Sequence, residues 1–273
     1  MSRVAAVQMV SGDDVAANLE TAARLLSRAQ QAGAVLAVLP ENFALMSARE
    51  AEKLEVAEAE GQGPIQEFLA TTARRLRLWI VAGTVPLQAD GRRVYAASLV
   101  YGDDGRQRAR YDKMHLFDVE LPGTEGAAER YRESATIAPG DDRTVVVETP
   151  AGRLGMTVCY DLRFPELYRR LGAAGAELLA VPSAFTARTG EAHWLSLLRA
   201  RAIENQCYVV APNQGGAHPG GRRTWGHSVI IDPWGQCLAE CENGEGVIVA
   251  ALPRDRLLNL RQSFPVLQHR RIP

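Results

Sequence analysis

Apolar and polar positions alternate along the chain in blocks that predict helices and strands in turn. Residues 14–31 place apolar side chains at helical spacing, with Asp13 or Asp14 available as the N-cap and Gly33 as the terminator. The run 34–39 is continuously apolar, which is typical of a strand buried on both faces of a sheet.

The same alternation continues to the end of the chain. Further strands are expected at residues 5–10, 78–85, 94–101, 145–147, 154–158, 178–181, 208–211, 227–231, 236–239 and 247–250. Further helices are expected at residues 64–76, 164–175 and 190–206, and residues 113–142 are expected to be irregular. This order indicates a mixed, layered α/β protein, and because no linker or repeat divides it, we expect one domain over residues 1–273.

Composition narrows the class of protein. The chain has 273 residues, of which 47% are hydrophobic and 23% charged, and its net charge is −1. These values are typical of a soluble globular protein and argue against a nucleic-acid or membrane partner. The start of the chain has no signal-peptide pattern, and the four cysteines lack metal-ligand spacing. We therefore expect a cytoplasmic enzyme with free thiols and no metal.

Cys159 stands where an apolar strand meets the helix expected after it. The run 154–158 ends directly at this thiol, and residues 160–166 lead into the helix. Unpaired N–H groups at a helix start stabilise negative charge and lower the pKa of a thiol. This position favours a nucleophile, although a buried cysteine is also a common small hydrophobic residue.

A thiol nucleophile needs a base, and Glu41 is the carboxylate in the most unusual setting. It follows the apolar run 34–39 and Pro40, where a charge contributes nothing to packing. Partial desolvation there is expected to raise its pKa toward the working range of a base. A loop or capping carboxylate is the other interpretation.

Lysine is rare in this chain. Among the 31 lysines and arginines, only Lys53 and Lys113 are lysine. The compact ammonium of lysine is a point donor that can face a tetrahedral oxyanion, where the wide fork of arginine imposes a different geometry. Lys113 is therefore a candidate oxyanion donor, with a solvated surface lysine as the alternative.

Three segments together resemble the motifs of the nitrilase (carbon–nitrogen hydrolase) superfamily. They are Leu-Pro-Glu-Asn-Phe at 39–43, Tyr-Asp-Lys-Met-His-Leu-Phe-Asp at 111–118 and Cys-Tyr-Asp-Leu-Arg-Phe-Pro-Glu at 159–166. The resemblance covers essentially the whole chain, and three ordered motifs are far more specific than one. It implies a four-layered αββα sandwich, usually paired into dimers through outer helices, with no metal or organic cofactor.

The resemblance also implies a Glu–Lys–Cys triad. In it Glu41 is the general base, Lys113 stabilises the oxyanion and Cys159 attacks the carbonyl carbon of an amide. A second glutamate often assists in this superfamily. Glu133 matches its position, while Glu120 and Glu125 lie nearer to Lys113 in the sequence. The implied reaction passes through a thioester that water then hydrolyses.

Later segments indicate the substrate class. Residues 185–190, 192–194, 198–204 and 225–228 resemble the branch that hydrolyses amides of α-keto acids, such as deaminated glutathione or, for the ω-amidases, 2-oxoglutaramate and 2-oxosuccinamate. Such substrates carry carboxylates, which arginine binds with two parallel hydrogen bonds. The expected substrate contacts are Tyr160, Arg163, Phe185, Arg188 and Thr189.

Alternatives to this substrate assignment stay open. The sequence is equally consistent with an ion pair of Arg163 with Asp161 or Glu166. A nitrilase proper or an N-carbamoyl hydrolase would share the triad. The glycine-rich segment 214–223 is expected to be a mobile loop that covers the site and influences substrate choice.

Overall fold

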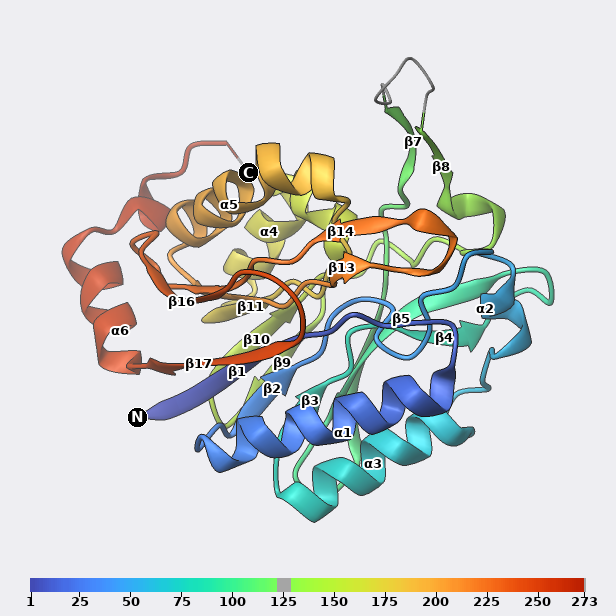
Figure 1. Cartoon of the computed structure of the whole chain (residues 1–273). Coiled ribbons are helices and arrows are strands. Elements are labelled where there is room, and N and C mark those ends of the chain that lie inside the picture. Colours follow the sequence, from blue (N-terminus) through green and yellow to red (C-terminus); the bar gives the residue numbers. More distant parts are fainter. Residues whose placement is uncertain (122–128, 273) are drawn as a thin grey trace.

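Two β-sheets packed face to face form the centre of the molecule (Figure 1). The computed structural model describes residues 1–121 and 129–272. The first sheet has the strand order β17 (Gly246–Leu252), β1 (Ser2–Gln8), β2 (Leu36–Val38), β3 (Trp79–Val81), β5 (Val94–Tyr101) and β4 (Val85–Gln88), with β6 (Gln107–Asp112) also paired to β5. The second has the order β16 (Cys237–Cys241), β15 (Ser228–Ile231), β12 (Tyr208–Ala211), β11 (Leu178–Ala180), β10 (Gly152–Met156) and β9 (Val146–Thr149).

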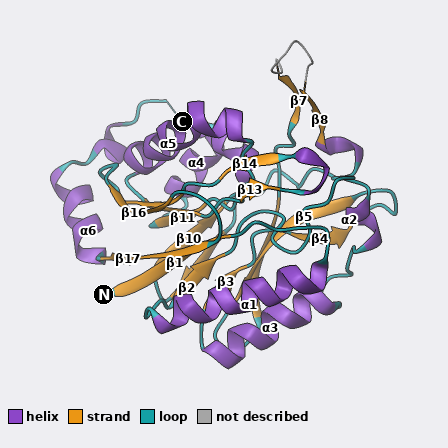
Figure 2. Ribbon diagram, in the orientation of Figure 1, coloured by secondary structure: helices purple, strands orange, loops and turns teal. Residues whose placement is uncertain are grey.

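Helices cover the outer face of each sheet (Figure 2). Helices α1 (Val15–Gln31) and α3 (Pro64–Leu76) pack against the first sheet, and α4 (Pro165–Ala173) and α5 (Ala187–Asn205) pack against the second. Two short helices, α2 (Glu52–Glu55) and α6 (Arg254–Ser263), lie at the edges of this arrangement. The structure thus confirms the mixed α/β class and the αββα sandwich.

Alternation along the strands explains why both faces of the first sheet are buried. In β1, Val4 and Ala6 belong to the core between the two sheets, whereas Ala5 and Val7 belong to the core under α1 and α3. Side chains on a strand point alternately to opposite faces, so a strand between two layers is apolar at every position. The continuous run at 34–39 has the same cause. Its strand spans Leu36–Val38, and of the six residues only Val35 is half-buried while the others are buried.

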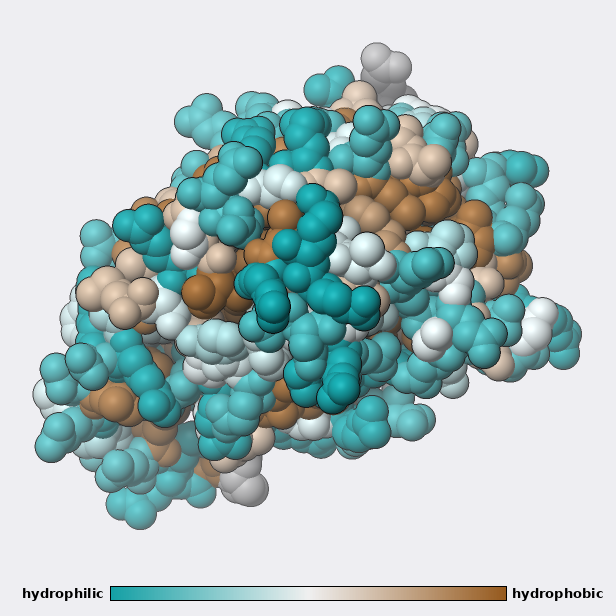
Figure 3. Space-filling model, turned by 90° about the horizontal axis from the view of Figure 1, so that it is seen from below, coloured by the Kyte–Doolittle hydropathy of each residue, from teal (hydrophilic) through white to brown (hydrophobic). Residues whose placement is uncertain are grey.

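Helices α1, α3 and α4 are amphipathic and turn their polar sides to solvent. Helix α1 begins after Asp14, whose side chain accepts a hydrogen bond of 3.1 Å from the Ala17 N–H, and Gly33 follows its end with φ 81°. Hydrophilic residues cover most of the surface seen from below, the side on which α1 and α3 lie (Figure 3). Both ends of this helix agree with the expectation from the sequence.

The strand expected at 78–85 is in fact two strands. β3 ends at Val81 and β4 begins at Val85, and Gly83 between them has φ 54°. A Cβ atom on Gly83 would lie 1.9 Å from the carbonyl oxygen of Pro40, so the chain can pass Pro40 this closely only with glycine. The break between β3 and β4 therefore leaves room for the backbone at Pro40, directly before Glu41.

Two other stretches were mispredicted. The segment 113–142 contains a hairpin of β7 (Asp118–Leu121) and β8 (Glu129–Arg132), which projects from the body in Figure 1. The segment 214–223 is ordered into β13 (Gly215–Ala217) and the short 3-10 helix η4 (Pro219–Gly221), followed by β14 (Arg223–Trp225). No helix within residues 1–121 and 129–272 is long and apolar enough to cross a membrane.

Candidate active site

Glu41 is held in place at the carboxyl end of β2. Its backbone carbonyl accepts a hydrogen bond of 3.1 Å from Gln214 Nε2, and the next residue, Asn42, donates its N–H to Thr84 Oγ1 at 2.8 Å. Glu41 is 4% exposed. The end of a buried strand thus delivers a carboxylate into the interior, as the sequence indicated.

Lys113 connects two carboxylates just after β6. Its Nζ lies 2.8 Å from Glu41 Oε1 and 2.8 and 2.9 Å from the two oxygens of Glu133, and the lysine is 1% exposed. Glu133 also accepts a 2.6 Å hydrogen bond from the Phe117 N–H. Buried charges are stable only when paired in this way, so the three side chains form one ion cluster.

Cys159 begins a five-residue 3-10 helix, η3 (Cys159–Arg163), at the turn after β10. Its φ is 47°, in the left-handed region that residues with a side chain seldom adopt. Its N–H donates to the Pro182 carbonyl at 2.9 Å. Backbone strain of this kind persists only when surrounding structure enforces it, and it concentrates at functional sites.

Two predictions about ionisation are wrong. Burial and then the negative charge of Glu41 raise the pKa of the Cys159 thiol well above its ordinary value, so the start of a short helix does not lower it. Burial also raises the pKa of Glu41, but the adjacent ammonium of Lys113 outweighs burial and leaves that pKa below its ordinary value. The resting site therefore holds a neutral thiol facing a carboxylate, which is the protonation state that a general base needs.

A fully buried carboxylate, Asp161, joins the segment that carries Lys113 to the turn that carries Cys159. Its Oδ2 accepts hydrogen bonds from the Tyr111 hydroxyl at 2.7 Å and the Val158 N–H at 2.8 Å. Its Oδ1 accepts from the His115 N–H at 3.1 Å and lies 2.7 Å from His115 Nδ1. Asp161 therefore fixes the separation between the residues flanking Lys113 and the turn that presents Cys159.

The Asp161→Asn variant is expected to lose stability and turnover together. Both carboxylate oxygens of Asp161 accept hydrogen bonds from N–H or O–H donors. The amide nitrogen of asparagine would face donors on one side, which should lower the free energy of unfolding by about 2–3 kcal/mol. In a chain of this size we expect a fall in Tm of about 4–10 °C and, through displacement of the thiol, a kcat about 10–100-fold lower. Calorimetry and steady-state kinetics measure both, with exposed Asp13→Asn as the control. A Tm and kcat equal to those of the control would contradict the linking role.

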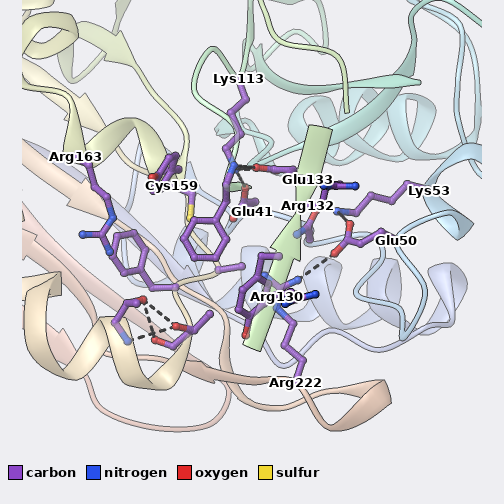
Figure 4. Close-up of a pocket in the computed structure, with 18 residues that line it drawn as sticks. Glu41, Glu50, Lys53, Lys113, Arg130, Arg132, Glu133, Cys159, Arg163 and Arg222 are labelled. Carbon is purple, nitrogen blue, oxygen red and sulfur yellow. Dashed lines mark hydrogen bonds and ion pairs between the residues drawn. The ribbon is translucent and has the colours of Figure 1, made fainter. Parts of the chain in front are cut away.

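The ion cluster and the thiol open into one pocket (Figure 4). The residues proposed from the sequence that line it are Glu41, Lys113, Glu133, Cys159, Tyr160, Arg163, Phe185 and Thr189. The structure thus brings together side chains from five separate segments.

Some expectations for the site need correction. Arg188 is exposed and does not line the pocket, because it lies in the first turn of α5 facing solvent. Two glutamates were possible alternatives to Glu133 as the partner of Lys113. Glu120 is exposed and pairs with Arg130 instead of Lys113, and Glu125 lies outside the described residues. Arg163 forms no ion pair with Asp161 or Glu166 in the described part of the chain and lies 3.3 Å from His193 Nδ1.

Other lining residues were not proposed from the sequence. They are Asn42, Glu50, Lys53, Phe117, Arg130, Tyr131, Arg132, Ala184, Thr186 and Arg222. One signal was present, because Lys53 and Lys113 are the two lysines of the chain and both line the pocket. Among the residues described, no group of three His, Cys, Asp or Glu side chains is arranged to hold a metal ion.

An αββα sandwich that presents a thiol beside a buried carboxylate and ammonium defines a hydrolase that acts on amides. The family model described as Carbon-nitrogen hydrolase matches residues 3–262. The chain belongs to this family, as the resemblance to the nitrilase superfamily predicted.

Individual relatives agree over almost the full length. A protein of Synechocystis sp. named deaminated glutathione amidase is 45% identical over 269 residues, which is 97% of both chains. The crystal structure of the Caenorhabditis elegans NitFhit protein is similar with a TM-score of 0.91 and 39% identity, over 99% of this chain and 65% of that one. An amidase of Nesterenkonia sp. AN1, with acrylamide added at its active site cysteine, has a TM-score of 0.79 and 28% identity over 97% of this chain and 99% of that one.

Proposed function

We propose that this enzyme hydrolyses the amide of deaminated glutathione, with Cys159 as the nucleophile of a Glu41–Lys113–Cys159 triad. The observation that carries the proposal is the shared pocket, where the neutral thiol faces a buried, ionised carboxylate paired with an ammonium. The relatives with this name support the choice of substrate.

The geometry supports the following reaction sequence. Glu41 accepts the thiol proton as the Cys159 sulfur bonds to the amide carbon, and the oxyanion accepts hydrogen bonds from Lys113 Nζ and the Tyr160 N–H. Glu41 then gives its proton to the nitrogen, the C–N bond breaks and the amine departs, so that the acyl group remains bound to Cys159 as a thioester. A water molecule that loses its proton to Glu41 attacks the thioester, and the proton returns to the sulfur as the carboxylic acid is released.

Glu133 has a different part in this scheme. Its two oxygens hold Lys113 Nζ at 2.8 and 2.9 Å, while its contact with the Phe117 N–H fixes the carboxylate itself. Burial lowers the pKa of Lys113, but the adjacent carboxylates of Glu133 and Glu41 outweigh burial and raise that pKa well above the ordinary value. Lys113 therefore stays charged as an oxyanion donor while Glu41 changes its protonation state.

Arg163 is expected to bind the carboxylate of the α-keto acyl group. It lies in the same short helix as Cys159, and its guanidinium lies 5.4 Å from the ring centre of Phe185 and 5.8 Å from that of Tyr160, without an ion-pair partner in the ranges described. We expect Arg163→Gln to raise KM about 10–100-fold, the value of a charged hydrogen-bonded contact. Steady-state kinetics measure this, and the solvent-exposed Arg106→Gln is the matched control. Equal KM values for the two variants would contradict this role.

The substrate assignment is tested by release of amine from four compounds. They are deaminated glutathione, 2-oxoglutaramate, a simple nitrile and an N-carbamoyl amino acid. We expect the highest kcat/KM for deaminated glutathione. Activity confined to the nitrile or the carbamoyl compound would overturn the proposal.

We further propose a single carbon–nitrogen hydrolase domain over residues 1–273 that forms a cytoplasmic homodimer or a dimer of dimers. Exposed apolar side chains at Ile203, Trp234 and Phe264 support a contact through outer helices, since Trp234 lies 6.1 Å from Phe264 between ring centres. Four free cysteines are typical of a reducing compartment. Light scattering after gel filtration measures the mass in solution, and a monomer would contradict the dimer.

A further inference from the structure

The pocket extends beyond the ion cluster to a second charged group, formed by Glu50, Lys53 and Arg222, which we term the distal cluster. Figure 4 shows it on the opposite side of Cys159 from Arg163. Two of its members come from the segment around α2, and Arg222 comes from the segment between η4 and β14. Cationic side chains are therefore present at both ends of the cavity.

One carboxylate holds the two cations of the distal cluster. Glu50 Oε2 lies 2.5 Å from Lys53 Nζ, and Glu50 Oε1 accepts a 3.2 Å hydrogen bond from Arg222 Nη1. Burial raises the pKa of Glu50, but Lys53 and then Arg222 lower it to a net value below the ordinary one, so Glu50 stays ionised. Two positive charges thus face a single negative one.

Arg222 has hydrogen-bonding capacity that the protein does not use. Its Nε is buried and has no hydrogen-bond partner in residues 1–121 and 129–272. Nη1 donates to Glu50, whereas Nη2 makes no hydrogen bond within the described residues and is the nitrogen left for a ligand carboxylate. A buried donor without a partner costs free energy that such a ligand would recover.

Lys53 offers a second unused set of donors. It is only 7% exposed, and its ammonium makes one hydrogen bond in the described structure, to Glu50. A lysine ammonium carries three N–H donors. A ligand carboxylate between Lys53 and Arg222 would therefore neutralise the excess positive charge and satisfy donors on both side chains.

We propose that Lys53 and Arg222 bind a carboxylate on the leaving-amine side of the substrate; the inference rests on the proposed function. After the C–N bond breaks, the acyl group stays on Cys159, so its carboxylate needs a partner near the sulfur, which Arg163 in the same short helix supplies. The amine half extends toward the other end of the pocket. Its preferred form is a peptide-like amine with a terminal carboxylate.

Aromatic side chains connect the two regions. The ring centres of Phe117 and Tyr131 are 5.1 Å apart, and Phe117 and Tyr160 are also separated by 5.1 Å. Tyr131 lies 5.8 Å from the Arg222 guanidinium, so this wall reaches from the turn that bears Cys159 to the distal cluster. It provides an apolar surface for the uncharged middle of the amine half.

The distal cluster then determines which amide is preferred. Deaminated glutathione releases a dipeptide that ends in a carboxylate, whereas 2-oxoglutaramate releases ammonia. Both have the same acyl group and use the same thiol. Contact with Lys53 and Arg222 therefore contributes to the binding of deaminated glutathione and not to the binding of 2-oxoglutaramate.

The test compares Arg222→Gln and Lys53→Met with wild type on three substrates: deaminated glutathione, its C-terminal carboxamide and 2-oxoglutaramate. Each variant is expected to raise KM for deaminated glutathione about 10–100-fold, with kcat changed by less than about twofold. KM for the other two substrates should stay within about twofold. The matched control is Arg223→Gln, which removes the same charge from the exposed neighbouring residue.

Two kinds of failure are distinguishable. Lack of wild-type turnover with both deaminated glutathione and 2-oxoglutaramate would overturn the proposed function and this inference with it. If wild type hydrolyses both substrates, two results would overturn the distal carboxylate site alone. One is an equal change in KM on all three substrates in the variants, and the other is equal wild-type KM for deaminated glutathione and its carboxamide.

Discussion

The Cys159→Ala variant is expected to lower kcat by at least about 10⁴-fold, because removal of a nucleophile leaves only binding and oxyanion contacts to assist water. Cys159 is 8% exposed, and alanine removes only its single sulfur atom, so the fold should remain intact. Release of the amine from deaminated glutathione measures turnover, while circular dichroism and Tm report the fold.

The matched control is Cys237→Ala, which removes a half-buried thiol from β16, outside the pocket. Its kcat should stay within about twofold of wild type, since it touches none of the proposed machinery. Wild-type turnover in Cys159→Ala would remove the nucleophile from the mechanism. A much lower Tm in that variant would instead indicate that the cysteine has a structural role.

Sequence patterning was informative where one local cause determines the structure. Helix α1 starts at Val15 because Asp14 caps it, and the run 34–39 is apolar because layers cover it on both sides. The positions of Glu41 and Cys159 follow from the same rule, since each polar residue ends a buried strand. Such features depend on residues that are neighbours in the sequence, so the pattern of apolar and polar positions is enough to predict them.

Features that depend on distant segments could not be predicted in this way. The predicted pKa directions of Cys159 and Glu41 were wrong for this reason. Burial and then the charge of Glu41 raise the pKa of Cys159, while Lys113 outweighs burial and lowers that of Glu41, and these residues come from three separate segments. The distal cluster similarly needs Arg222 beside Glu50, 172 positions earlier in the chain. Only the rarity of lysine pointed to it in advance.

The Glu41→Gln variant is expected to lower kcat about 10²–10⁴-fold, the usual contribution of a general base. In wild type Glu41 must be ionised to accept the thiol proton, and its pKa lies below the ordinary value of 4.5. Activity should therefore be lost only as the pH falls below that value, with no loss between about pH 6 and 8. A pH profile of kcat/KM measures this limb. An acid limb centred above pH 5 would contradict the ionised resting carboxylate.

The same variant should also lower the pKa of the Cys159 thiol while the Tm stays near that of wild type. Loss of structure would lower this pKa too, by exposing the thiol, but it would lower the Tm as well. After burial, the negative charge of Glu41 is the largest cause that raises the pKa of Cys159, so neutral glutamine should lower that pKa. Because the thiolate is the reactive form, alkylation of Cys159 by iodoacetamide should begin at lower pH in Glu41→Gln than in wild type. Mass spectrometry of the Cys159 peptide measures the rate, and exposed Glu148→Gln is the control. A thiol that becomes reactive while the enzyme becomes inactive would establish that Glu41 acts by taking the proton, whereas an unchanged or higher pKa would show that its charge does not reach the sulfur.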